Sequence, residues 1–238
     1  MRRMLLFLLL AAVPLSTFAQ SSENKRLRDI DSQIRRASYD INAIMAAPDK
    51  AIPSDLLDKA VCVGIIPSEL KFAFMFGGTY GRGVLVCRKN GTGEWGEPAM
   101  FTLGGGSFGL QIGGAESSVI FLVMNAKGAR ELTTSNAKIG VDVTGAAGPV
   151  GRHLAASTTG QMGAEILTYS RSHGIFAGIS LDGAVIKQDL EDDRALYGAN
   201  ATPKDILIRQ TVTKRPGARV LNRTLDKYSP HGGQPITL

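Results

Sequence analysis

The glycine-rich sequence GGGSFG at residues 104–109 is the part of this chain whose spacing comes closest to known chemistry. It satisfies G-x-G-x-x-G, which lets a dinucleotide pyrophosphate approach the N-terminus of a helix. It also satisfies G-x-S-x-G around Ser107, the turn that exposes a nucleophilic serine in α/β-hydrolases. Both motifs require a helix directly afterwards, but LQIGG follows and alternates like a strand. We therefore interpret both matches as accidents of a glycine-rich strand.

A serine hydrolase using Ser107 is kept as an alternative, because Asp142 and either His153 or His173 follow in the chain order of α/β-hydrolases. Against it, the strand-rich pattern lacks the crossover helices of that fold. The three histidines fall in predicted loops or in the tail without the spacing of metal ligands. The residues therefore indicate no enzyme, no metal site and no cofactor.

The amino-terminal sequence MRRMLLFLLLAAVPLSTFA predicts a secretory signal at residues 1–19, with cleavage after Ala19. We accordingly expect a secreted or periplasmic protein. Loss of Arg2 and Arg3 would lower the formal net charge from +6 to +4. Such an excess suits an anionic surface, and a lipid or polysaccharide is a more natural partner for it than nucleic acid.

Cys62 and Cys87 are the only cysteines, and neither belongs to a C-x-x-C motif. Because sequence fixes no geometry, a disulfide and two buried thiols are both open interpretations.

Two segments have the spacing of amphipathic helices. Residues 22–47 repeat apolar side chains every three or four positions up to Pro48, and residues 219–228 carry a shorter stripe that includes Val220. Basic residues lie on the far side of the first helix and beside the stripe of the second, where they could form a solvated face or contact phosphate head groups. The candidate lipid-binding residues are Lys25, Arg28, Arg35, Arg36, Arg219, Arg223 and Lys227.

Between these helices the pattern predicts short strands. The segments 61–66, 70–76, 83–88, 108–113, 119–124 and 139–143 are expected as strands, with a hairpin formed by 165–170 and 175–187. Residues 77–83 are expected as a flexible connection and 127–134 as a short helix. Because 119–124 is apolar without alternation, we expect it to be central and covered on both faces. Acidic residues gather at 189–193. The fold class is α+β: a strand-rich, mostly antiparallel curled sheet with an N-terminal amphipathic helix and a short C-terminal helix.

Residues 52–207 resemble the SYLF domain, a family of lipid-binding modules of which some eukaryotic members are described as actin-binding. The resemblance lies in PS with LLDKA at 53–60, YGRGVLV at 80–86, WGEPA at 95–99, GGGSFGLQIGGAESSVIFLVMN at 104–125, AAGPVGRH at 146–153, YSRSHGIFAGISLDGAVI at 169–186, YG at 197–198 and DIL at 205–207. It implies a strand-rich α+β domain without catalysis, and lipid contact through basic residues of the N-terminal helix.

We therefore divide the chain into a signal at 1–19, a helical region at 20–51, a SYLF-like core at 52–208, and a basic C-terminal helix and tail at 209–238. The leading hypothesis is a non-enzymatic protein that binds an anionic phospholipid or membrane surface, without nucleic acid and with an unknown protein partner. The alternative is an envelope protein-interaction or structural factor.

Overall fold

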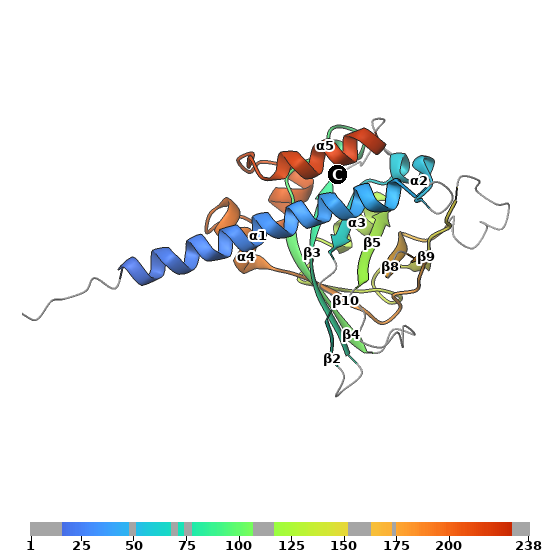
Figure 1. Cartoon of the computed structure of the whole chain (residues 1–238), viewed down its shortest axis with the longest axis horizontal. Helices are drawn as coiled ribbons and strands as arrows, with labels where there is room; N and C mark the ends of the chain where they lie inside the picture. The colour runs from blue at the N-terminus through green and yellow to red at the C-terminus, as the bar shows by residue number, and fades with distance from the viewer. Residues whose placement is uncertain are drawn as a thin grey trace, which may run out of the picture.

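The computed structural model of the chain describes residues 16–47, 51–67, 71–73, 78–106, 117–151, 163–172 and 175–229. The α+β fold expected from the sequence is confirmed, with helices packed against one curled sheet (Figure 1). The helices are α1 (Ser16–Met45), α2 (Ser54–Lys59), α3 (Ala126–Glu131), α4 (Leu190–Tyr197) and α5 (Ala218–Tyr228), with short helical turns η1 (Lys89–Gly91) and η3 (Asp205–Arg209). The strands are β1 (Cys62–Ile66), β2 (Lys71–Ala73), β3 (Gly78–Cys87), β4 (Ala99–Gly106), β5 (Ser117–Val123), β6 (Asn136–Lys138), β7 (Gly145–Ala147), β8 (Ile166–Ser172), β9 (Ile175–Gly178) and β10 (Val185–Gln188).

The strands follow the order β6-β10-β4-β3-β1-β5-β8-β7, with β2 on β3 and β9 on β8. The ladders are antiparallel except for the parallel pair β7 and β8. Strand β5 lies between β1 and β8, and all seven of its residues are buried. The predicted central, doubly covered strand is thereby confirmed.

Each face of the sheet buries its own apolar cluster, because successive side chains of a strand point to opposite faces. Along β3, Val84 and Val86 join the cluster beneath α1, α2 and α5, whereas Leu85 and Cys87 join the cluster on the opposite face. We call these the helix-side cluster and the inner cluster.

Helix α1 supplies the helix-side cluster with a stripe spaced by three or four residues, as expected of an amphipathic helix. The stripe consists of Ile30, Ile34, Ala37, Ile41 and Ile44. The predicted helix is confirmed, but it begins at Ser16 rather than Ser22. It therefore runs through the predicted cleavage point after Ala19. Residues 1–15, which hold most of the predicted signal, lie outside the described residues.

The predicted flexible connection at residues 77–83 is wrong for its described part, because residues 78–83 form the first half of β3. Glycine is required there for close packing. A Cβ atom on Gly83 would lie 2.5 Å from Cζ of Phe101 on the neighbouring strand. Gly83 therefore admits the large Phe101 side chain from the facing strand rather than loosening the chain.

Two other strand predictions are wrong. Ile139 and Val143 are both buried and form a single parallel bridge, while Val141 between them is 72% exposed. The backbone turns at Gly140, whose φ is +88°, so these residues make a tight turn instead of a strand.

The predicted hairpin is confirmed only for β8 and β9. After β9 the chain turns at Gly183 and enters β10, which pairs with β4 and β6 at the other side of the sheet. In β9 Ile175 is exposed and Phe176 is buried, so this strand turns Phe176 towards the core. The predicted strand 108–113 lies outside the described residues.

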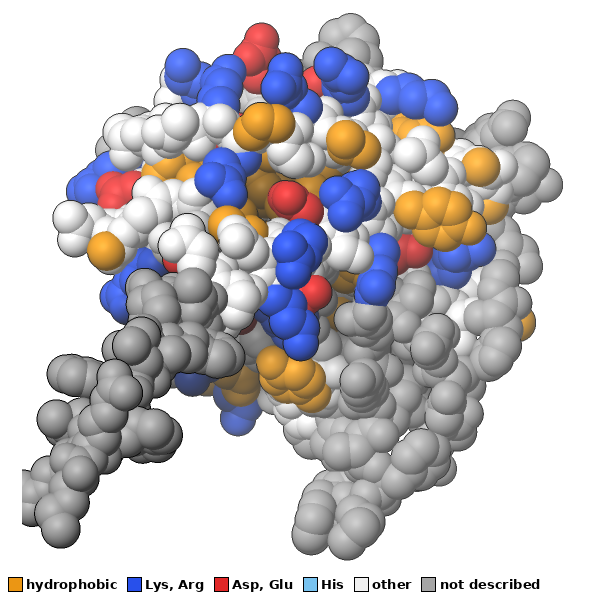
Figure 2. All heavy atoms as spheres, turned by 60° about the vertical axis from the view of Figure 1, so that its left-hand side comes forward, with side chains coloured by type: hydrophobic (Ala, Val, Ile, Leu, Met, Phe, Trp, Pro, Cys, Tyr) orange, Lys and Arg blue, Asp and Glu red, His pale blue; other side chains and the backbone are white. Residues whose placement is uncertain are grey.

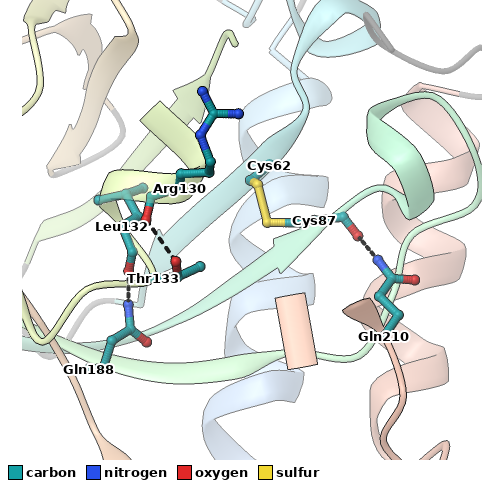
Figure 3. Close-up of a disulfide and its surroundings, with 7 residues drawn as sticks. All are labelled: Cys62, Cys87, Arg130, Leu132, Thr133, Gln188 and Gln210. Carbon is teal, nitrogen blue, oxygen red and sulfur yellow. Dashed lines mark hydrogen bonds between the residues drawn. A yellow bond between two sulfur atoms is a disulfide. The ribbon is translucent and has the colours of Figure 1, made fainter. Parts of the chain in front are cut away.

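A disulfide joins Cys62 of β1 to Cys87 of β3, whose Cα atoms face each other across the ladder (Figure 3). Both residues are buried in the inner cluster. Figure 3 also shows the Gln210 side chain, which donates from Nε2 to the Cys87 carbonyl oxygen at 3.1 Å. The segment that follows η3 is thereby attached to the end of β3.

Candidate functional site

Helices α1 and α5 form a parallel pair over the sheet, linked by neutral hydrogen bonds. The hydroxyl groups of Ser38 and Thr224 are 2.7 Å apart, and Asn42 donates from Nδ2 to Thr224 at 3.4 Å. Tyr228 donates its hydroxyl hydrogen to Asn42 at 3.1 Å. Residues further along α1 therefore contact residues further along α5, which shows that the two helices run in the same direction (Figure 1).

The outward side of this pair carries most of the basic residues proposed from the sequence. At 100° per residue, Arg28, Arg35 and Tyr39 project from α1 on its solvent side towards α5. On α5, Val220, Arg223 and Lys227 project beside them. We call these six residues the basic face. Figure 2, seen from the side on which α1 begins, shows Lys and Arg side chains spread over the helices with hydrophobic and fewer acidic groups between them.

The remaining proposed residues are exposed but lie elsewhere. Lys25 and Arg36 project from the flank of α1 that is turned away from α5, and Arg219 projects from the far flank of α5. Helical phase therefore turns Arg28, Arg35, Arg223 and Lys227 to the outward side of the helix pair, and turns Lys25 and Arg36 away from α5.

Two apolar members of the basic face were missed by the sequence analysis. Tyr39 is 68% exposed and Val220 is 46% exposed. Val220 was expected in the buried stripe of α5, but it lies towards α1 and solvent, whereas Leu221 and Leu225 are buried. The available signal was the position of Tyr39, opposite the buried isoleucines on a helical wheel.

A cavity of about 540 Å³ lies on the other flank of α5, between that helix and residues 89–97. Arg219, Asn222, Arg223 and Asp226 line it from α5, at the spacing of one helix face. The other lining residues are Lys89, Glu94, Trp95, Gly96, Glu97, Gln210, Val212, Lys214, Arg215 and Pro216. The sequence analysis identified only Arg219 and Arg223 from this group.

Burial perturbs the ionisable groups around this cavity. It raises the pKa of Glu97, whose Oε2 accepts the backbone N–H of Arg215 at 2.9 Å. Burial also raises the pKa of Asp226, while Arg88 opposes that change. Arg88 itself has its pKa lowered by burial. Its guanidinium stacks 4.0 Å from the centre of the Trp95 ring and donates to the Ser229 carbonyl at 2.8 Å, so it supports Trp95, which lines the cavity.

On the opposite flank of α1, the predicted acidic patch lies in and next to the first turn of α4 and is paired with arginines. Arg26 on α1 contacts Glu191 at 2.5 Å and Asp192 at 3.8 Å. Arg82 on β3 pairs with the same Asp192, whose side chain is 5% exposed. These contacts hold α4 against α1 and the sheet.

Asp193, the last residue of this patch, is fully buried. Its Oδ1 accepts the backbone N–H of Met100 at 2.7 Å. Burial raises the pKa of Asp193 to about 8, and repulsion from Asp189 and Asp192 adds to the increase. Among the described residues, no three His, Cys, Asp or Glu side chains are grouped as metal ligands.

Of the residues considered for a serine hydrolase, the described part of the chain includes Asp142. Ser107, His153 and His173 lie outside the described residues. Asp142 is exposed, and its Oδ2 accepts the backbone N–H of Lys138 at 2.8 Å, which closes the turn at Gly140. Among the described helices, none combines the length and the apolar composition needed to cross a bilayer.

Comparison with known proteins gives a consistent set of relatives. A family model described as "Las17-binding protein actin regulator" matches residues 104–228. The chain is similar to LAS seventeen-binding protein 3 of Saccharomyces cerevisiae, with 34% identity over 78% of the chain and 41% of the relative. It is also similar to Protein YSC84 of the same yeast, with 32% identity over 82% of the chain and 42% of the relative.

A human relative, SH3 domain-containing YSC84-like protein 1, is 31% identical over 78% of the chain and 55% of its own length. The chain therefore spans about half or less of the curated relatives that it matches. These relatives correct the predicted location. They are eukaryotic proteins of a family described as actin regulators, and because actin is cytosolic they point to the cytosol. The secreted or periplasmic location is contradicted by this finding.

Proposed function

The chain belongs to the Ysc84 (SYLF) family, as its motifs predicted, and from this premise we propose a non-enzymatic module that docks on anionic phospholipid surfaces through its basic face. The observation that carries the proposal is the parallel packing of α1 and α5. It places Arg28, Arg35, Arg223 and Lys227 on one exposed surface, together with Tyr39 and Val220.

The charges of this surface are available to a ligand. Among the described residues, Arg28, Arg35, Arg223 and Lys227 form no salt bridge with a carboxylate. Lys227 contacts the neighbouring Tyr228, with its Nζ 4.7 Å from the ring centre and 3.1 Å from the hydroxyl oxygen. Lysine and arginine next to a bilayer contribute about 1 kcal/mol each when they meet anionic head groups.

The apolar members of the basic face support a lipid in particular. An exposed tyrosine has an apolar ring and a polar hydroxyl group, which suits the boundary between head groups and acyl chains. Tyr39 and Val220 lie among cations in this way. A purely solvated face has no need of either side chain.

Vesicle sedimentation of the full chain tests the proposal. We expect binding to phosphatidylcholine vesicles that contain phosphatidylglycerol, little binding to phosphatidylcholine alone, and weaker binding as NaCl increases. The double charge reversal Arg28→Glu with Arg35→Glu should weaken binding by about 2 kcal/mol or more, roughly 30-fold. The matched control reverses Lys138 and Lys187, which are exposed on β6 and β10. Equal losses in the two double variants would contradict the proposal.

A protein partner is the second candidate, since the family description and the yeast relative's name both report protein binding. We propose that the same basic face would then contact an acidic protein such as filamentous actin. Co-sedimentation with purified actin filaments tests this alternative. Binding to filaments that Arg28→Glu with Arg35→Glu abolishes, without binding to vesicles, would favour the protein partner over the lipid.

A further inference from the structure

The cavity between α5 and residues 89–97 has the features of a small-ligand site, and we propose that it binds a phosphate monoester dianion. Its volume of about 540 Å³ lies within the usual range for small-molecule sites, about 300–1,000 Å³. A cavity of this size suits a single phosphorylated group rather than a long polymer.

The floor of the cavity is fixed by two side-chain amides. Asn222 donates from Nδ2 to the carbonyl oxygens of Trp95 and Gly96, at 3.1 Å and 3.0 Å. Gln210 donates to the Cys87 carbonyl and fills the space beside Gly96, where a Cβ atom would overlap its amide group. These contacts hold α5 and the preceding loop in place before any ligand arrives, which reduces the entropy lost on binding.

The walls carry an excess of positive charge. Five cationic side chains and three carboxylates line the cavity, so two positive charges are left uncompensated when every group is ionised. None of the five cations forms a salt bridge with a described carboxylate. Glu97 is already engaged by the backbone N–H of Arg215. A dianion would balance this excess.

The arrangement of the cations favours phosphate over two separate carboxylates. Arg219 and Arg223 are four residues apart on one face of α5, so their Cβ atoms lie roughly 6 Å apart. Lys89 and Lys214 line the cavity from η1 and from the loop before α5. Guanidinium groups form paired hydrogen bonds with phosphate oxygens, and lysine adds a compact charge. One tetrahedral group can accept from all of these sides.

A phosphate monoester group can come from two sources, a soluble phosphate monoester or the head group of a phosphatidate lipid. Because Arg223 belongs both to the cavity and to the basic face, a head group could enter from a docked membrane. That second source rests on the proposed function, whereas binding of a soluble phosphate monoester does not.

Calorimetric titration of the full chain with glycerol 3-phosphate tests the site directly. We expect saturable binding with a dissociation constant on the order of 1 mM or tighter, and at least fivefold weaker binding of succinate, which has the same charge. Lys89→Ala and Lys214→Ala should each weaken the binding of glycerol 3-phosphate about fivefold or more. Lys138→Ala, an exposed lysine outside the cavity, should leave it unchanged. Absent binding, equal binding of succinate, or equal weakening by Lys138→Ala would overturn the inference.

Vesicle binding then shows whether the phosphate group belongs to a lipid head group or to a soluble phosphate monoester. If the ligand is a lipid, vesicles with phosphatidate should bind more tightly than vesicles of equal charge with phosphatidylglycerol, and Lys89→Ala should remove only that preference. If the ligand is soluble, glycerol 3-phosphate binds and the vesicles show no preference. Loss of all vesicle binding with retained glycerol 3-phosphate binding would reject the proposed function and leave this site intact.

Discussion

The two flanks of α1 are attached to their neighbours by different chemistry. On one flank α4 is held by ion pairs, in which Arg26 and Arg82 meet Glu191 and Asp192. On the other flank α5 is held by the uncharged contacts of Ser38, Asn42, Thr224 and Tyr228. The cations near α4 are therefore structural, and those on α5 remain exposed.

This difference separates cations that stabilise the fold from cations that are available to a ligand. A count of basic residues treats Arg82 and Arg223 alike, yet only Arg82 is paired with a carboxylate that is 5% exposed. Replacing such an arginine leaves a buried charge without a partner, which is costly. Replacing an exposed cation with no partner changes little in the folded protein.

The largest expected effect comes from Arg82→Met. Because Asp192 would keep its burial and lose its nearer partner, retaining the longer contact with Arg26 at 3.8 Å, we expect the free energy of unfolding to fall by about 2–3 kcal/mol. Arg223→Met is the matched control on α5 and should change it by about 0.5 kcal/mol or less. Urea denaturation measures both. Similar losses in the two variants would remove the distinction between the flanks.

The next effect is a pH dependence that originates beside α4. Burial raises the pKa of Asp193 from 3.8 to about 8, so between these values the folded protein keeps a proton that the unfolded chain has lost. The stabilisation that comes from the raised pKa of Asp193 is therefore fully present below pH 3.8. It decreases as pH rises towards 8, and the free energy of unfolding falls by up to about 1.4 kcal/mol per pH unit. Asp193→Asn should flatten the decline measured by urea denaturation between pH 6 and 7.5. An unchanged slope in this variant would show that other groups cause it.

A smaller effect is expected at the contact between α1 and α5. Ser38→Ala should cost about 1 kcal/mol, because the buried Thr224 hydroxyl loses one hydrogen-bond partner. A double-mutant cycle with Thr224→Val should give a coupling energy of 0.5 kcal/mol or more, about the same at low and high NaCl. Additive losses, or a coupling that disappears in salt, would contradict an uncharged link.

The smallest effect is expected for Arg26→Ala. Its partner Glu191 is largely exposed, so the loss should be about 0.5 kcal/mol at low ionic strength and should diminish in 0.5 M NaCl. Thermal unfolding at both salt concentrations measures it. A loss as large as that of Arg82→Met would mean that the exposed pair stabilises the protein as much as the buried pair does.

Much of the fold could be predicted where the pattern of burial is local. The amphipathic α1, the doubly covered β5 and the C-terminal α5 follow from apolar spacing alone, because each buries one stripe or two faces. The predictions failed where glycines were interpreted by their flexibility. Gly83 makes room for the Phe101 side chain of β4, whereas Gly140 and Gly183 turn the chain. The spacing of glycines in the sequence does not distinguish a glycine that admits a large side chain from one that turns the chain.

The candidate site was predicted only in part. The sequence supplied the exposed cations of α1 and α5, but not that Lys25 and Arg36 are turned away from α5. It gave no sign of the cavity, because Lys89, Lys214 and the amides of Gln210 and Asn222 come from separate segments. Tyr39 was missed because it lies outside the apolar stripe of α1, and Val220 because the stripe of α5 was treated as wholly buried.

By itself the sequence determined the family, the α+β class, the buried stripe of α1 and the basic character of both outer helices. Only the tertiary structure decided which cations are paired and which surfaces meet. Arg82 meets Asp192 across 110 residues of chain, and Ser38 meets Thr224 across 186. The spacing of apolar residues shows which side of a helix or strand is buried. Which element packs against that side depends on contacts between residues far apart in the sequence. The basic face and the cavity both depend on that choice, because each is built from segments that only folding brings together.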